Sequence, residues 1–385
     1  MNKKLVAVAV AGVLAAPLAA EAQTANVTLY GRLNLTMEAV NGQAVDPNLP
    51  ATAAPVNRTI YRVNSNSSRL GVRGSEALGG GLTAIFQIES SIVADASGGT
   101  LAGRETFVGL QGSWGTFKMG YFLSPYDDIH PIFGNVPTLT TSILSTAALW
   151  AQGSQNNDNG GYDNRNPNSI RYDSPRMAGF TASAQLSTMD ASAATGGTDA
   201  QAKRHAYIGS LGGFYNNGPW QAGLAYERNQ NVRATSTVDQ AFSIAGGYNF
   251  GIARVAGVYE RLDYDTPTGD LKRDLYGATV TFNLGPGQGY FGWIHGDKGK
   301  GSSADGTQVA GLVKGNDTKS DEFVVSYTYP LSKRTLTYVG YVTIVNDDNA
   351  RYTFNINPVN QSAATGGLTG QGKPQGLVGG IVHFF

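Results

Sequence analysis

Residues Leu82–Glu89 read LTAIFQIE, and they directly follow the turn-rich stretch Ser75–Gly81, which reads SEALGGG. Every second residue from Leu82 onward is apolar, whereas the alternate positions end in Gln87 and Glu89. A period of two is typical of a β-strand whose two faces meet different surroundings. The stretch therefore predicts a strand with one apolar face, entered from a tight turn.

The same alternation recurs along the chain in segments of roughly the length of a tilted transmembrane β-strand, about 9 to 11 residues. It is found at Val27–Thr36, Glu322–Tyr329, Leu336–Ile344 and Leu377–Phe385. After residue 22, no stretch approaches the roughly 18 uninterrupted apolar residues that a membrane helix requires. Any crossing of a membrane is therefore expected to use strands.

The gaps between these segments alternate between short and long. Seven short gaps are rich in turn residues, namely Ser75–Gly81, Gly112–Gly115, Ser174–Gly179, Asn216–Pro219, Asn249–Gly251, Leu284–Gly289 and Pro330–Arg334. Eight long gaps are polar, namely Glu38–Asn57, Ala94–Ala102, Ser124–Asn166, Asp190–Ala202, Gln230–Val238, Tyr264–Lys272, Gly296–Lys319 and Asn346–Gln375. Outer-membrane barrels combine short periplasmic turns with longer extracellular loops. These connections predict an all-β fold, a single 16-stranded antiparallel transmembrane β-barrel over residues 23–385.

A soluble β-sandwich or β-propeller also contains many short strands. Neither fold requires a systematic alternation of short and long loops. In a bilayer every backbone N–H and C=O group must be paired within the protein, so a sheet there has to close. The loop pattern therefore favours the barrel.

The N-terminal residues have the organisation of a secretory signal peptide. A cationic start with Lys3 and Lys4 precedes the apolar run Leu5–Ala16, and the A-x-A sequence Ala20–Ala22 follows. This order is typical of a cleaved export signal. Residues 1–22 are therefore predicted to be a signal peptide, with Gln23 as the first residue of the mature protein.

The composition excludes several classes of function. The 385 residues include 28 Lys and Arg, 28 Asp and Glu, and no cysteine. We expect no nucleic-acid partner, because binding to phosphates relies on a surplus of Lys and Arg. Without cysteine, the chain can form no disulfide, no thiolate metal site and no cysteine nucleophile.

Aromatic residues are abundant, with 15 Phe, 19 Tyr and 4 Trp. Tyr and Trp are favoured at membrane–water interfaces, where the ring is half-buried and its polar atom stays hydrated. We expect girdles of aromatic side chains around the barrel, with the candidates Tyr329, Tyr338, Trp220, Phe385 and Tyr290.

Catalytic signatures are missing from the sequence. It contains neither G-x-S-x-G nor H-E-x-x-H, and Gly367–Lys373 has the spacing of a phosphate-binding loop but is followed by Pro374. The acidic pairs Asp127-Asp128 and Asp347-Asp348 lack the multi-ligand spacing of a divalent-ion site, so solvated loops are favoured there. We expect no enzyme activity and no cofactor.

Several blocks of sequence carry a family resemblance. They are Val27–Gly31, Ser68–Leu82, Ala84–Glu89, Val108–Gly112, Trp114–Gly120, Asn168–Pro175, Tyr329–Thr335 and His383–Phe385. Together they resemble the Gram-negative general porins of the β-proteobacterial and neisserial type, across essentially the whole mature chain. The resemblance implies a homotrimer in the outer membrane of a Gram-negative bacterium. It also implies a water-filled pore in each subunit, narrowed by a third extracellular loop that folds inward.

The long gap Ser124–Asn166 is the third extracellular connection of the predicted barrel. Structureless loops of this length are uncommon and usually have a function. Residues 124–166 are therefore the candidate constriction loop. The acidic residues on this loop are Asp127, Asp128, Asp158 and Asp163.

Strand parity directs five basic side chains inward when their apolar neighbours face lipid, namely Arg32, Arg69, Arg73, Lys118 and Arg171. A Lys or Arg on the lipid face at mid-depth costs roughly 2 to 4 kcal/mol. A basic wall opposite the acidic loop, with Asp127 and Asp128, would bias which ions and small hydrophilic solutes pass. The basic residues outnumber Glu89 and Glu105 on the early strands, which predicts a mild anion preference, although loop acids could reverse it. Alternatively, single arginines only pair with these two glutamates.

Three functions remain compatible with the predicted barrel. The first is a general diffusion porin, and the second is a channel specific for a sugar, an amino acid or an organic acid. The aromatic residues near the loop, Tyr121, Phe122, Tyr126 and Trp150, keep the second open. The third is a plugged barrel such as an adhesin, which single-channel conductance would distinguish.

The chain ends on Phe385, preceded by apolar residues at every second position. This ending resembles the signal that the outer-membrane barrel insertion machinery reads. Expected partners are therefore that machinery, outer-membrane lipids and lipopolysaccharide, besides the ions and small hydrophilic solutes that pass through the channel.

Overall fold

The computed structural model describes residues 26–42, 59–134, 142–152, 161–188, 205–309, 311–359 and 372–385. The predicted signal peptide, residues 1–22, lies outside these ranges. No helix in the described part of the chain is long and apolar enough to cross a membrane.

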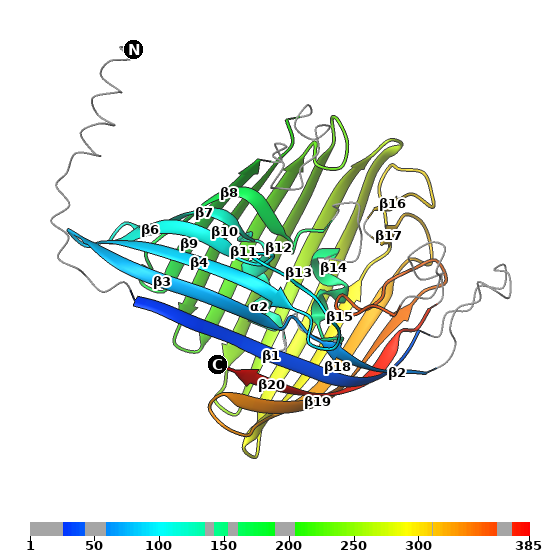
Figure 1. Ribbon diagram of the computed structural model, residues 1–385. Helices are drawn as coiled ribbons and strands as arrows, with labels where there is room; N and C mark the ends of the chain where they lie inside the picture. The colour runs from blue at the N-terminus through cyan, green and yellow to red at the C-terminus, as the bar shows by residue number, and fades with distance from the viewer. Residues whose placement is uncertain are drawn as a thin grey trace, which may run out of the picture.

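The described residues form a closed antiparallel barrel of 16 strands (Figure 1). In chain order they are β1 (Asn26–Asn41), β2 (Ile60–Ser65) with β3 (Arg69–Gly79), β4 (Leu82–Ile92), β6 (Thr106–Gly112), β7 (Gly115–Leu123), β8 (Arg165–Asp173), β9 (Phe180–Thr188), β10 (Tyr207–Asn217), β11 (Trp220–Gln230), β12 (Val238–Asn249), β13 (Ala253–Thr266), β14 (Gly269–Leu284), β15 (Gly287–Gly296), β18 (Ser320–Pro330), β19 (Thr335–Asn346) and β20 (Gln375–Phe384). Strands β2 and β3 count as one interrupted strand because both pair with β1. The short strands β5 (Gly99–Thr100), β16 (Gln308–Val309) and β17 (Leu312–Val313) lie in the connections.

The barrel closes where the first strand meets the last, drawn in blue and dark red in Figure 1. Strand β1 pairs with β3 on one side and with β20 on the other. At the end of this seam, the backbone N–H of Gly31 donates to the carbonyl of Phe385 at 3.0 Å, and Phe385 N–H donates to Gly31 O at 3.1 Å. Closure leaves the barrel sheet of the described residues without a free edge, which a barrel in a bilayer requires.

The predicted alternation of short and long connections is largely present, with one correction. The gap Tyr264–Lys272 was expected to be a loop, but β13 and β14 run through it to a turn at residues 267–268. The strands continue here because the segment still has one inward and one outward face. Tyr264 and Leu271 are fully buried on the inward face. On the other face Lys272 forms an ion pair with Asp263 at 3.2 Å.

The two faces of the barrel wall differ in exposure. On β12, for example, Phe242 and Ile244 are exposed, whereas the alternate residues Ser243 and Ala245 are buried. The exposed apolar face is the one that lipid would contact, because hydrocarbon accepts apolar side chains without cost. The buried face therefore points to the barrel interior.

The aromatic candidates divide between these two faces. Trp220, Tyr329 and Phe385 are exposed on the outer face, as predicted for girdle residues. Tyr290 and Tyr338 point inward and are buried, so their assignment to a girdle was wrong. Their hydroxyls donate inside the barrel, from Tyr290 to the carbonyl of Phe133 at 3.1 Å and from Tyr338 to Asn34 Oδ1 at 3.0 Å.

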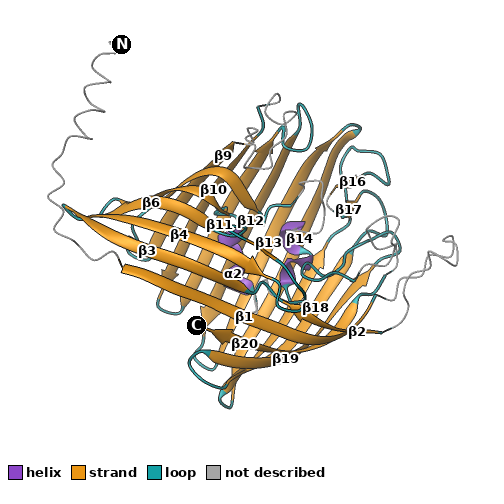
Figure 2. Cartoon of the chain, in the orientation of Figure 1, coloured by secondary structure: helices purple, strands orange, loops and turns teal. Residues whose placement is uncertain are grey.

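The long β7–β8 connection, residues 124–164, contributes much of the buried core. Its described parts contain η2 (Asp127–Ile129), α2 (His130–Phe133), η3 (Thr146–Ala148) and η4 (Trp150–Gln152). Their apolar side chains form one buried cluster with inward side chains of β11–β15 and β18–β20. Figure 2 shows these short helices, in purple, among the strands. Apolar residues on these strands can therefore face inward without being exposed to water.

Candidate functional site

Four strands of the early half, β1, β3, β7 and β8, carry the predicted basic side chains. We call the inner face of these four strands, together with that of β4, the basic wall. Arg32 and Arg69 are direct register partners on β1 and β3, so they lie side by side. Their apolar neighbours Leu33 and Leu70 are exposed on the outer face. The two guanidinium groups therefore extend from the same inward surface.

Glu89 on β4 is the acid closest to this pair. It accepts from Arg104 Nε at 2.6 Å and from the Tyr30 hydroxyl at 3.0 Å, and Arg69 Nε lies 3.7 Å from its second oxygen. Two arginines thus share one carboxylate. Arg104 was not predicted from the sequence, because it lies in the connection after β4, where strand parity has no meaning.

Arg73 lies further along β3 toward the short turns. Its side chain is exposed, and its guanidinium carbon stacks 4.9 Å from the centre of the Tyr30 ring. It lines a hollow of about 270 Å³ together with Gln87 and Phe107. The structure therefore separates Arg73 from the Arg32–Arg69 pair and places it nearer the turn end of the barrel.

Lys118 and Arg171 form a second basic pair, as register partners on β7 and β8. The Lys118 ammonium lies 5.0 Å from the ring centre of Phe107 and 4.7 Å from that of Phe122, within the range of cation–π attraction. Among the described residues, neither Arg32, Arg73 nor Lys118 forms an ion pair.

One acid of the β7–β8 connection, Asp128, contacts this second pair directly. Arg171 Nη2 lies 2.5 Å from Asp128 Oδ2, and Arg171 Nε donates to Asp173 at 2.8 Å. Asp128 therefore contacts a basic residue of the wall instead of facing it across open space. Asp127 is half-buried in the same short helix, and it has no ion pair within the described part of the chain. Asp158 lies outside the described residues.

The β7–β8 connection is fixed to the opposite side of the interior, which we call the covered wall (inner faces of β11–β15 and β18–β20). Glu260 on β13 accepts from the backbone N–H of Ala151 at 2.7 Å, and Arg273 on β14 donates to the carbonyl of Leu149 at 2.6 Å. Trp150 donates to Ser243 at 3.1 Å. Glu260 and Arg273 also pair with each other at 3.4 Å, and both are fully buried. These anchors fix the path of the connection.

Sequence reasoning missed this anchor, although one signal for it exists. Arg273 shares its face of β14 with Leu271 and Leu275, all fully buried. An arginine among leucines cannot face lipid cheaply. Such a face must point inward and be covered by another part of the chain.

Aromatic side chains of the connection pack within it. The rings of Tyr126 and Trp150 stack at 5.5 Å, and His130 stacks on Trp150 at 4.9 Å. Burial without a charged partner lowers the pKa of His130 to about 3, so this imidazole is neutral at physiological pH. Since Phe122, Tyr126 and Trp150 are fully buried, they do not form an exposed aromatic track for a specific solute.

The described residues contain no group of three or more His, Asp or Glu side chains arranged to hold a metal ion. The features that remain are a closed barrel, an apolar outer face, and charged side chains on one interior wall. Together these features define a transmembrane channel protein of the outer-membrane type.

Comparison with known proteins gives the family. A model of the Gram-negative porin family matches residues 6–349. The chain is 29% identical over 392 residues to outer membrane porin protein 32 of Delftia acidovorans, with 100% of both chains covered. Its fold is similar to that of an anion-selective porin from Comamonas acidovorans, with a TM-score of 0.70, 24% identity, and 94% and 100% of the two chains covered. It is also similar to OmpT of Vibrio cholerae in a trimer form, with a TM-score of 0.63, 14% identity, and 94% and 99% covered.

The chain therefore belongs to the Gram-negative porin family. It is located in the outer membrane and acts as a porin channel. Family membership points to passive passage and not to catalysis.

Proposed function

We propose that residues 124–166 narrow the channel and that the basic wall gives it a mild preference for anions among ions and small hydrophilic solutes. The connection is anchored to the covered wall, so the basic wall borders the space that remains. Fixed charges beside a narrow aqueous path change the local concentration of mobile ions.

One observation carries the anion preference. The acids Glu89 and Asp128 are held by arginines, and Glu89 by two of them, whereas Arg32, Arg73 and Lys118 have no ion pair in the described structure. A carboxylate that is paired with an arginine contributes little net charge at a distance. The charge that permeating ions meet is therefore positive on balance. The anion selectivity named for the Comamonas acidovorans porin agrees with this proposal.

A planar-bilayer experiment tests the proposal. The purified protein is reconstituted, and the reversal potential is measured across a potassium chloride gradient. We expect a single-channel conductance typical of an open pore. We also expect a reversal potential that is shifted from zero toward the equilibrium potential of chloride. A cation-selective potential would contradict the anion preference, and a channel with almost no conductance would indicate a plugged barrel.

Assembly is the second part of the proposal. We infer a homotrimer, which the trimer form of Vibrio cholerae OmpT supports. We also infer removal of residues 1–22 on export, insertion by the outer-membrane barrel machinery, and contact with lipopolysaccharide. N-terminal sequencing of the mature protein is expected to begin at Gln23, and native mass spectrometry is expected to give three copies.

Phe385 is expected to be needed for assembly. It forms both backbone hydrogen bonds with Gly31 at the closing seam, and its ring lies against the same residue. Deletion of Phe385 should lower the amount of folded protein in the outer membrane, measured by heat-modifiable gel migration of membrane fractions. Normal levels of the truncated protein would contradict this role.

A further inference from the structure

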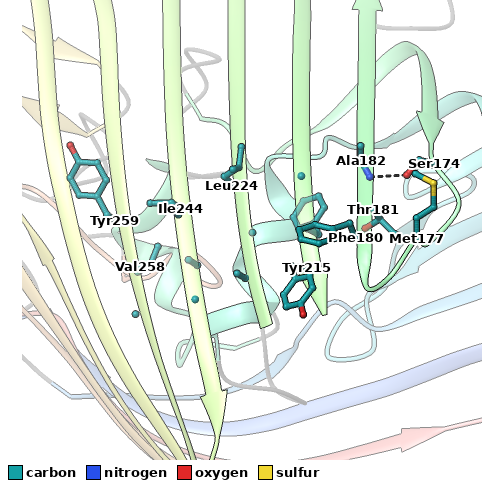
Figure 3. A pocket seen from close by; sticks show the side chains of 17 residues that line it. Ser174, Met177, Phe180, Thr181, Ala182, Tyr215, Leu224, Ile244, Val258 and Tyr259 are labelled. Carbon is teal, nitrogen blue, oxygen red and sulfur yellow. Dashed lines mark hydrogen bonds between the residues drawn. The ribbon is translucent and has the colours of Figure 1, made fainter. Parts of the chain in front are cut away.

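The outer surface of the barrel is hollowed across β9–β13 (Figure 3). The hollow has a volume of about 780 Å³ and is lined by 17 residues, none of which is charged. Its sides include the exposed apolar side chains of Phe180, Leu224 and Ile244. Tyr259 lies toward one end of the hollow, and Met177 and Ser174 lie toward the other (Figure 3). We call this hollow the outer groove.

Small residues form the floor of the outer groove. A Cβ added at Gly213 would lie 3.9 Å from Leu224 Cγ, at Gly246 it would lie 4.0 Å from Gln221 O, and at Gly257 it would lie 3.6 Å from Gly277 O. These are ordinary contacts or open space, and none of the three glycines has a positive φ. Neither close packing nor backbone conformation therefore requires glycine here. Glycine in the interior of a strand weakens the strand. The feature that these three glycines share is that the outer groove lies open above each of them.

The groove lies on the membrane-facing surface of an outer-membrane protein. An apolar hollow of this size is unfavourable when empty, because its lining atoms lose dispersion contacts. Water is a poor occupant, since most of the lining is apolar and the polar side chains, such as Ser174 and Tyr259, lie toward its ends. Hydrocarbon from the surrounding bilayer is the matching occupant.

A cationic group marks one end of the groove. Met177 and Ser174 line the groove and belong to the short turn between β8 and β9. In the same turn Arg176 is exposed, and its guanidinium donates to the carbonyl of Asn216, the neighbour of the groove residue Tyr215. Short turns of such barrels lie on the periplasmic side. Arg176 therefore lies where the phosphate of a periplasmic-leaflet lipid would be, and guanidinium binds phosphate well.

We propose that the outer groove binds one acyl chain of a phospholipid from the periplasmic leaflet, with the phosphate against Arg176. The chain fills the space above Gly213, Gly246 and Gly257, and the guanidinium fixes the head group at the interface. The porin would thus carry a specific lipid position in addition to its general lipid annulus.

Native mass spectrometry of the folded porin tests this proposal. The protein is equilibrated in detergent micelles doped with palmitoyl-oleoyl phosphatidylethanolamine, or with the diacylglycerol of the same chains. The variant Gly246→Leu fills the floor of the groove. Gly209→Leu is its control, because Gly209 also faces open space on the outer face of β10 but does not line the groove. Heat-modifiable migration confirms that each variant is folded, and Gly213→Leu replaces Gly246→Leu if the latter does not fold.

We expect phospholipid adducts on the wild-type protein and on Gly209→Leu. Gly246→Leu should weaken retention about tenfold, the effect of losing burial of about two methylene groups. Arg176→Gln should reduce retention of the phospholipid but not of the diacylglycerol. Equal retention by Gly246→Leu and Gly209→Leu would overturn the proposal. It would also be overturned if Gly246→Leu changed the number of porin subunits, because a second protein would then be the occupant.

Discussion

The basic wall and the covered wall belong to the same barrel, but their inner faces are built differently. On the basic wall most inward side chains are charged or polar, with Val40 and Phe122 as apolar exceptions, and residues such as Arg69 and Arg73 keep some exposure. On the covered wall many inward side chains are apolar, including Leu262, Leu275 and Ile294, and they are fully buried.

The difference arises from one loop. The β7–β8 connection packs on the covered wall and supplies the apolar partners that make inward leucines stable. The polar groups buried beneath it are matched to its backbone, as Glu260 is to Ala151 N–H and Arg273 to Leu149 O. An inner face can thus be either a lumen surface or a protein core, depending on what covers it. A substitution on either wall can therefore be compared with a matched substitution on the outer face.

The largest expected effect comes from Arg273→Met on the covered wall. The change leaves Glu260 fully buried without its cation, and removing one partner of a buried pair costs about 3 to 5 kcal/mol. We expect a marked fall in thermal stability, measured by heat-modifiable gel migration, and larger current fluctuations in single channels. The control is Arg261→Met, because Arg261 is half-exposed on the outer face and its ion pair to Asp274 is long at 3.7 Å. Equal losses in the two variants would show that the anchor has no special role.

Overpacking the same wall should have a smaller effect. A Cβ at Gly340 of β19 would lie 2.7 Å from Leu144 Cδ1, so Gly340→Leu must displace the β7–β8 connection. Forcing extra volume into a packed core costs about 1 to 3 kcal/mol. We expect lower thermal stability and altered single-channel conductance. Gly379→Leu on β20 is the matched control, since a Cβ there meets only Tyr338 O at 4.0 Å. The covered wall would not be a packed core if both variants behaved alike.

This comparison also explains what could be predicted from the sequence. The period of two in segments such as Leu82–Glu89 predicted the strands, and the loop lengths predicted their number. The same period does not indicate which face meets lipid. Tyr290 and Tyr338 were therefore placed on the outside, although both point inward and donate hydrogen bonds there.

The site was predictable to the extent that it depends on strand parity. The inward direction of Arg32 and Arg69 follows from their exposed neighbours Leu33 and Leu70. The contact between Arg171 and Asp128 could not be predicted, because it depends on the path of a long connection. No local periodicity encodes that path, which is fixed by contacts between residues more than a hundred positions apart, such as Arg273 and Leu149.

On the basic wall, Arg171→Gln should change selectivity more than stability. The change removes the cation that Asp128 contacts and leaves a carboxylate free to attract cations. Two charges about 4 Å apart interact by about 1 kcal/mol in water, which corresponds to roughly a fivefold change in the anion-to-cation permeability ratio. The reversal potential in a salt gradient measures this ratio. Arg228→Gln on the outer face of β11 should leave it unchanged, and a similar shift in both variants would refute a local effect on the lumen.

The smallest expected effect concerns pH and an acid near the end of the β7–β8 connection. Burial raises the pKa of Asp163 to about 6, while a hydrogen bond from Asn355 Nδ2 at 3.4 Å opposes the rise. As the pH falls through about 6, this carboxylate becomes neutral and one negative charge is lost close to Arg165. At a separation near the Debye length of about 8 Å, one charge contributes roughly 0.5 kcal/mol, or about a twofold change in permeability ratio. We therefore expect the anion preference to be modestly higher at pH 5 than at pH 7.5. These two pH values lie roughly one unit below and one and a half units above that pKa. In Asp163→Asn the contribution of this group disappears, so the variant should show the higher anion preference at both pH values. If wild type and variant change in parallel with pH, another group on the lumen surface is the one that titrates.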